Sequence, residues 1–269
     1  MMWTKQKLGV SGWTFGQRPL PDISARTQAL NYDGLTLTVD PERDTAVSIQ
    51  QTLAAHNLEL FAIAPPELDV AHSETAVRQS AIATYLKLVD FAAELERPLL
   101  IVRSMKGRNR PLATLAAEMG WLATAVAQIA QYAAEKEVRV VIEVLNRYET
   151  HLVNTGAAAL ALLETVGLDN VGIMLNAFHM NIEEQDAATV MRQAGDRLWL
   201  FAMSDSNRRA IGQGHTKLGN HLWALEDIGY EGPIILECLP PNVDPVRPFL
   251  DDQSLEVLER YLRDSRTWF

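Results

Sequence analysis

The sequence has little cysteine, little positive charge and no long apolar run. Its 269 residues include one cysteine, Cys238, which excludes an internal disulfide and a cysteine-rich zinc site. Lysine and arginine total 24 residues against 34 aspartates and glutamates, giving a formal charge of −10 at pH 7. Nucleic-acid binding requires a basic surface, so this charge disfavours nucleic acid as the main partner. No apolar run approaches the ~20 residues of a membrane helix.

Three further absences bear on the location of the protein, its fold and its number of domains. No long apolar segment with a cleavage site follows the first residues, so we expect no secretory signal and a soluble, cytoplasmic protein. No glycine-rich phosphate loop follows the first predicted strand, because SGWTFG matches that pattern poorly, and this disfavours an open doubly wound sheet. The chain also has no linker or low-complexity tract, which predicts one domain over residues 1–269.

Short apolar segments alternate with helical patterns along the whole chain. Strands are predicted at residues 8–13, 34–39, 58–64, 98–102, 138–143, 170–175, 198–203 and 233–237. Helices are predicted at 44–57, 73–96, 112–136, 156–166, 182–194, 219–228 and 250–264, with one apolar stripe from Leu112 through Leu115 to Ala133 in the third of them. Nearly continuous apolar strands suit a parallel sheet buried on both faces. The pattern predicts an α/β fold, a single (β/α)₈ TIM barrel of ~250 residues.

Catalytic groups in such a barrel come from the C-terminal ends of the strands. Glu143 and Glu237 each end an apolar strand. Two carboxylates facing each other across the barrel can share a divalent cation, or act as acid and base on two faces of a substrate. The structural alternative is that each is paired with a nearby arginine and only closes its strand end.

Other polar side chains follow neighbouring strand ends. Asn176 and His179 come after strand 170–175, and Arg208 follows strand 198–203. His215 lies in a glycine-rich loop, where an exposed histidine is as good an interpretation as a functional one. The segment RSMKGRNR supplies four basic residues, Arg103, Lys106, Arg108 and Arg110. They predict either an anion-binding loop or an ordinary solvated loop.

Four motifs carry a family resemblance: IEVLNRYE, LNAFHMNIEE, SDSNRRAIGQGH and LECLPP. Together they make the chain similar to the xylose-isomerase-like sugar isomerases and epimerases, and among these to the ketose 3-epimerases of the tagatose and psicose type. The resemblance runs from SGWTFG to the ECLPP end and implies a (β/α)₈ barrel, a sugar or polyol substrate and a homo-oligomer, a dimer or tetramer.

The resemblance also implies roles for individual residues. Glu143 and Glu237 match the two glutamates that bind the metal and exchange a proton at the epimerised carbon. Glu149, His179 and Arg208 match the substrate-binding glutamate, histidine and arginine. All five positions keep the residue type of the family.

The remaining metal positions differ from the family. Its metal, usually manganese, cobalt or magnesium, is held by two glutamates, an aspartate and a histidine. The aspartate falls on Asn176 and the histidine on Ala202, which has no donor atom. A divalent cation held by Glu143, Asn176 and Glu237 would therefore bind weakly or not at all.

These observations predict a sugar isomerase or epimerase, with a sugar phosphate or sugar acid as open alternatives for the substrate. The altered metal positions keep two other functions open. One is a metal-free, catalytically degenerate sugar-binding barrel. The other is a lyase or dehydratase, because proton abstraction next to a carbonyl also begins an elimination. The DNA-repair endonucleases of the superfamily are disfavoured by the acidic charge and the altered ligands.

Overall fold

Eight parallel strands form a closed barrel in the computed structural model, which describes residues 6–104 and 107–269. Each strand pairs with its neighbour in sequence, and β1 closes the ring by pairing with β8. The strands are β1 Leu8–Ser11, β2 Gly34–Thr38, β3 Glu59–Ala64, β4 Leu99–Arg103, β5 Val140–Glu143, β6 Val171–Asn176, β7 Leu198–Met203 and β8 Ile234–Leu236. We call their C-terminal end the mouth of the barrel and their N-terminal end its base.

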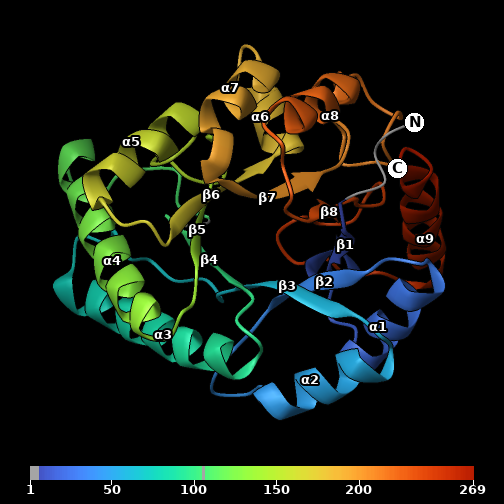
Figure 1. Ribbon diagram of the computed structural model, residues 1–269, viewed down its shortest axis with the longest axis horizontal. Helices are drawn as coiled ribbons and strands as arrows, with labels where there is room; N and C mark the ends of the chain where they lie inside the picture. Colours follow the sequence, from blue (N-terminus) through green and yellow to red (C-terminus); the bar gives the residue numbers. More distant parts are fainter. Residues whose placement is uncertain (1–5, 105–106) are drawn as a thin grey trace.

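Helices surround the strands as a ring (Figure 1). They are α1 Leu20–Ala29, α2 Ala46–Ala55, α3 Thr75–Glu94, α4 Leu115–Glu135, α5 Gly156–Val166, α6 Ala177–Glu183, α7 Ala187–Ala194, α8 Leu218–Asp227 and α9 Asp252–Arg266. Helix α9 closes the ring against α1 through an ion pair between Glu259 and Arg26. The Tyr32 hydroxyl also donates to the Leu262 carbonyl (2.7 Å). The two ends of the chain are thereby tied to one barrel.

The core has two layers. A large cluster packs the outward faces of the strands against the helices, and a smaller one fills the inside of the barrel. Small side chains recur in the inner cluster, among them Ala62, Ala64 and Ala202. Ala64 lies at the end of β3 and lines the mouth, where its short side chain leaves space for longer polar groups.

The predicted fold and all eight predicted strands are confirmed, but one helix was wrong. Residues 182–194 do not form a single helix. Helix α6 ends at Glu183, and α7 begins after Asp186, whose carboxylate accepts a hydrogen bond from the Thr189 amide as an N-cap. The short helix α6 follows β6 directly and is the element that carries His179.

Two other differences concern a helix that was not predicted and a helix that begins later than predicted. The structure contains α1, a helix that the sequence analysis did not predict, with proline in its first turn. The predicted stripe on 112–136 was too long, because α4 begins at Leu115. Leu112 lies before the helix, and both leucines are about half exposed. Their apolar surface therefore does not belong to the core.

Within residues 6–104 and 107–269, every helix is too short or too polar to cross a bilayer.

Candidate functional site

The mouth brings the predicted residues together. Glu143 ends β5, Asn176 ends β6, and Glu237 follows β8 directly. A cavity of about 30 Å³ lies between them, and Glu143, Glu237, His179 and Arg208 all line it. The fifth predicted residue, Glu149, contacts Arg208 from the loop after β5 (3.4 Å).

Glu143 is held by an arginine from the neighbouring strand. Arg103 ends β4 and is the register partner of Glu143. Its Nε donates to Glu143 Oε2 (2.5 Å), and the glutamate side chain is only 5% exposed. Burial disfavours the charged guanidinium, but the attraction of Glu143 outweighs it and raises the pKa of Arg103. The sequence analysis considered an arginine beside each glutamate but did not name Arg103 as the partner of Glu143, although its position at the end of a neighbouring strand was a usable signal.

Glu237 is held by an amide and a guanidinium. Asn176 Nδ2 donates to Glu237 Oε2 (2.7 Å), and Arg208 Nη1 lies 3.5 Å from the same oxygen. The amide orientation is fixed because Asn176 Oδ1 accepts from the Phe178 backbone N–H, a group that can only donate. Asn176 therefore caps helix α6 with its oxygen and presents its NH₂ group to Glu237.

Each glutamate has one anchored oxygen. The Oε1 atoms of Glu143 and Glu237 make no hydrogen bond with any described residue, and neither belongs to the buried polar atoms that lack both a partner and contact with solvent. Two carboxylates thus line one cavity with one oxygen each available to a substrate. The pairing with arginine that we considered as a structural alternative is present, and it leaves these two oxygens uncommitted.

Arg208 lies between two aromatic rings. Its guanidinium carbon is 4.0 Å from the centre of the Phe178 ring and 5.2 Å from that of Trp13. Its backbone is left-handed, with φ of 58°, a conformation that costs a non-glycine residue energy. A surrounding structure must therefore hold Arg208 in place.

That support comes from Asp205, a buried carboxylate that organises the loop after β7. It accepts hydrogen bonds from the backbone N–H groups of Ser206, Gly212 and Thr216 at 2.7, 2.9 and 3.1 Å. Burial acts to raise the pKa of Asp205, but these N–H groups outweigh it and lower the pKa. The ionised Asp205 thus fixes the loop from which Arg208 reaches the cavity.

His179 is buried on α6 in a defined tautomer. Its Nδ1 faces the Asn146 backbone N–H (3.2 Å) and the Asn146 Nδ2 (2.8 Å). The backbone N–H can only donate, so Nδ1 accepts and the ring proton of the neutral form sits on Nε2. A histidine held this way carries its N–H at Nε2, where it can donate a hydrogen bond. The sequence analysis did not assign Asn146 this orienting role.

The basic loop is mostly committed to carboxylates. Arg108 binds Asp69 (2.9 Å) and the fully buried Glu118 (2.7 Å), which also meets His151 Nε2 (2.8 Å). Burial opposes ionisation of Glu118, yet Arg108, two backbone N–H groups and His151 lower its pKa to about 2. With Arg103 on Glu143 and Arg108 in this network, the anion-binding interpretation loses two of its four cations. Arg110 is exposed, and Lys106 lies outside the described residues.

His215 does not line the cavity and is exposed, with Nδ1 3.0 Å from the Ser206 hydroxyl. His221 is buried on α8 and stacks on Phe201. Burial lowers its pKa below the usual 6.5, so it is a neutral core residue. Neither histidine joins the candidate site.

The donor set at the mouth does not fit a divalent cation. Asn176 turns its NH₂ group, not its oxygen, toward Glu237, and its register partner Ala202 contributes only a methyl group. Guanidinium groups already lie beside both glutamates. Among the described residues, no group of three or more His, Cys, Asp or Glu side chains could hold a metal ion.

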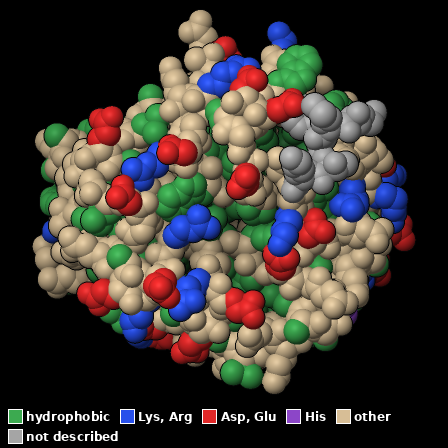
Figure 2. Space-filling model, viewed as in Figure 1, with side chains coloured by type: hydrophobic (Ala, Val, Ile, Leu, Met, Phe, Trp, Pro, Cys, Tyr) green, Lys and Arg blue, Asp and Glu red, His purple; other side chains and the backbone are tan. Residues whose placement is uncertain are grey.

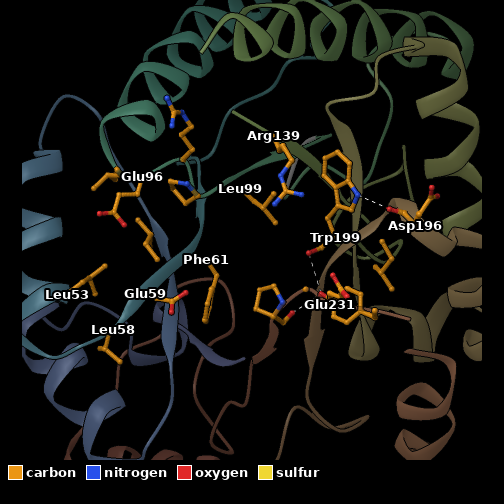
Figure 3. Close-up of a pocket in the computed structure, with 18 of the residues that line it drawn as sticks. Leu53, Leu58, Glu59, Phe61, Glu96, Leu99, Arg139, Asp196, Trp199 and Glu231 are labelled. Atoms are coloured by element: carbon orange, nitrogen blue, oxygen red, sulfur yellow. Dashed lines mark hydrogen bonds between the residues drawn. The ribbon is translucent and has the colours of Figure 1, made fainter. Parts of the chain in front are cut away.

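A much larger cavity, about 850 Å³, lies at the base. Its wall combines apolar residues such as Phe61 and Leu99 with charged ones at the rim, and Arg139 lies over the Trp199 ring (Figure 3). The Trp199 indole donates to the Asp196 carbonyl (2.8 Å). Catalytic groups of TIM barrels gather at the mouth, and the base serves stability. We therefore place the candidate site at the small cavity and not at the large one.

Comparison with known proteins identifies the family. Residues 24–261 match the model described as xylose isomerase-like TIM barrel. A ketose 3-epimerase of Arthrobacter globiformis is 32% identical over 248 residues, which is 88% of this chain and 85% of that protein. A D-psicose 3-epimerase of Agrobacterium fabrum is 43% identical over 109 residues, 40% of this chain and 38% of that protein.

Solved structures share the fold. A D-psicose 3-epimerase of Clostridium cellulolyticum H10, solved with D-tagatose, superposes with a TM-score of 0.87 at 20% identity and covers 97% of both chains. A D-allulose 3-epimerase of Methylomonas sp. superposes with a TM-score of 0.86 at 24% identity, covering 98% of this chain and 96% of that one. The chain belongs to the xylose isomerase-like TIM barrel family.

Proposed function

We propose that the protein is a sugar epimerase or isomerase that moves a proton between Glu143 and Glu237. The observation that carries this proposal is the pair of available Oε1 atoms on two anchored carboxylates at one cavity. Proton transfer by a positioned carboxylate requires an uncommitted oxygen within reach of the substrate. The ketose 3-epimerases among the relatives support the reaction class.

The reaction balances without a further reagent. One glutamate takes the proton from the carbon next to the substrate carbonyl, and the C–H electron pair forms an enediolate whose negative charge lies on oxygen. The other glutamate, protonated at the start, delivers its proton to the opposite face of that carbon, and the carbonyl re-forms. The configuration at carbon is inverted, and exchange with water resets the two carboxyl groups. In the reverse direction the two glutamates exchange roles.

The charges at the mouth favour a neutral substrate. Three carboxylates, Glu143, Glu149 and Glu237, face two guanidinium groups, Arg103 and Arg208. These described groups sum to −1 with both Glu143 and Glu237 ionised, and to 0 once one of them carries the proton that the reaction requires. In neither state would a phosphate or carboxylate on the substrate meet an excess of positive charge among these groups. We therefore favour a neutral ketose or polyol over a sugar phosphate or sugar acid. His179 and Arg208 would donate to hydroxyl or carbonyl oxygens, and Glu149 would accept from a hydroxyl.

Substrate entry requires Arg208 to move. A cavity of about 30 Å³ holds little more than a water molecule, far less than the roughly 300 Å³ of ordinary ligand pockets. Among the described residues, the polar contacts of the Arg208 side chain are long, 3.5 Å to Glu237 and 3.4 Å to Glu149, and its guanidinium also lies between two aromatic rings. The open-chain ketose would take the space next to Trp13 and Phe178 as the guanidinium shifts.

The test is turnover of a panel of neutral ketoses, including D-psicose and L-ribulose, by Glu143→Gln and Glu237→Gln. Glutamine keeps the side-chain shape and an acceptor oxygen but cannot take a proton from carbon. We expect turnover to fall by roughly 10²–10⁴-fold in each variant with an unchanged melting temperature. The control is Glu231→Gln, an exposed carboxylate at the base, which should keep full activity. Wild-type turnover in both mouth variants would refute the proposal.

A second candidate is a sugar-binding barrel without turnover. Asn176 and Ala202, which replace the metal ligands expected from the resemblance, and the nearly filled cavity favour it. Calorimetric binding of a ketose with no turnover over the whole panel would support this candidate. A dehydratase would instead release a product lighter by one water, which mass spectrometry distinguishes from an epimer.

A further inference from the structure

The positive charge at the mouth belongs to two arginine side chains of the protein. Arg103 and Arg208 each lie beside one of the two glutamates, and both line the cavity. Their side chains are 20% and 10% exposed, so water screens them only partly. Buried charges act more strongly on one another than exposed ones. The two guanidinium groups therefore balance the charges of Glu143 and Glu237 without an added ion.

We propose that Arg103 is a positioning residue that replaces a divalent cation, so that the proton exchange proceeds without metal. This inference rests on the proposed function. Arg103 donates to Oε2 of Glu143 and so orients Oε1 toward the cavity, while its charge offsets the negative charge that develops on the enediolate oxygen. Fixed charges aimed at a developing oxyanion are among the largest contributions to enzyme catalysis.

The contacts of Arg103 show how firmly it is held. Its backbone N–H donates to the Tyr85 hydroxyl (3.1 Å), and its Nη1 donates to the Pro65 carbonyl (3.4 Å). Tyr85 is completely buried on α3, and burial raises the pKa of its hydroxyl, which therefore stays neutral. Arg103 is thus held through its backbone N–H and through Nε and Nη1 of its side chain.

The two hydrogen bonds of the Asn176 side chain explain why an amide suits this position. An aspartate at this position, capping α6 through one oxygen, would turn its second oxygen toward Glu237 Oε2, and the two negative charges would need a cation between them. The amide of Asn176 instead donates a hydrogen bond. Arg103 on one glutamate and Asn176 on the other thus remove the electrostatic need for a metal at both carboxylates.

The first arm of the test measures metal dependence on the full chain. Protein treated with EDTA and dialysed is assayed for bound metal by mass spectrometry and for ketose turnover with and without added Mn²⁺. We expect less than about one metal ion per ten chains, unchanged turnover, and no shift of the melting temperature with Mn²⁺ alone. Turnover that chelation abolishes and Mn²⁺ restores overturns the inference and leaves the proposed function intact.

The second arm tests Arg103 with Arg103→Gln and Arg103→Lys. We expect Arg103→Gln to lower kcat by roughly 10²-fold with KM changed less than about threefold, and Arg103→Lys to recover part of kcat because it keeps the charge. The control is Arg139→Gln, an exposed arginine at the base. Wild-type kcat in Arg103→Gln, or an equal loss in the glutamine and lysine variants with an equally lowered melting temperature, refutes the role.

The two arms distinguish a failure of the proposed function from a failure of the metal-free inference. If the glutamate variants retain turnover, the proposed function fails whatever the metal dependence. If a chelated wild-type protein shows no turnover but Mn²⁺ binds and raises its melting temperature, the metal-free inference fails by itself. The binding measurement does not require an active enzyme.

Discussion

The mouth and the base of the barrel differ in how they use charge and space. The base has about 850 Å³ of open volume, a rim of exposed charges and the half-buried rings of Phe61 and Trp199. The mouth has about 30 Å³, and the side chains of Glu143, Arg103, Glu237 and Arg208 there are at most 20% exposed and paired with one another or with Asn176. Buried charges are expensive and persist only where they are paired. Their concentration, and not the amount of empty space, marks the site.

The face of the molecule drawn in Figure 2 mixes charges of both signs. Figure 2 shows one face of the molecule, on which Lys and Arg side chains are interspersed with Asp and Glu side chains. A nucleic-acid partner would favour a continuous basic area, and this face agrees with the net charge of −10 in offering none among its described residues.

The largest expected effect distinguishes the mouth from the base of the barrel. A substitution at the mouth should reduce activity, and one at the base should reduce stability. Arg208→Met keeps the bulk between the rings but removes the charge, and we expect kcat/KM to fall by roughly 10³-fold with little loss of stability. Trp199→Ala at the base should do the opposite. Its ring packs directly on Gly172, so its loss should lower the free energy of unfolding by about 2–3 kcal/mol and leave kcat unchanged. Urea denaturation and steady-state kinetics on both variants measure this.

A second test adds a negative charge beside Glu237 at the mouth. Asn176→Asp keeps the N-cap of α6 but places a second carboxylate oxygen against Glu237. We expect the melting temperature in EDTA to fall by several degrees, corresponding to about 1–2 kcal/mol, and Mn²⁺ to recover part of the loss. The same titration on Asn170→Asp, far from the mouth, controls for surface binding of Mn²⁺. An unchanged melting temperature in EDTA would show that Asn176 and Glu237 are not coupled.

The smallest expected effect is on the pH dependence of stability, to which Glu118 contributes through its contacts with Arg108 and His151. The pKa of Glu118 is about 2 in the folded protein, below its ordinary value of 4.5. The unfolded chain therefore takes up a proton first as pH falls, so this contribution to stability is present above about 4.5 and disappears toward pH 2. In Glu118→Gln the acid limb of the stability curve should be flatter than in wild type. Chemical denaturation from pH 7 to pH 3 compares the two slopes.

The barrel and the two glutamates were predictable because they depend on local pattern. A strand that is apolar until its last residue places that residue at the mouth, as Glu143 shows. The Arg103–Glu143 pairing was harder, since it depends on the register of β4 against β5 and on side-chain rotamers. The orientation of Asn176 was not predictable, because it follows from one backbone N–H in α6.

The helix errors have a similar cause. Two of the three buried residues of helix α1 are polar, Ser24 and Thr27, so apolar spacing gave little signal there. The interruption between α6 and α7 depends on Asp186 acting as an N-cap, a local choice that the apolar spacing of residues 182–194 hides.

Asn176 has one more consequence, for the mechanics of the site. A single amide is bonded to the first turn of α6 with its oxygen and to Glu237 with its nitrogen. Helix α6 also carries His179 and Phe178, which touch Asn146 and Arg208. Glu237, His179 and Phe178 are thus linked through helix α6. A displacement of α6 should be transmitted to all three together, so the site is expected to respond to its ligand as one cooperative unit.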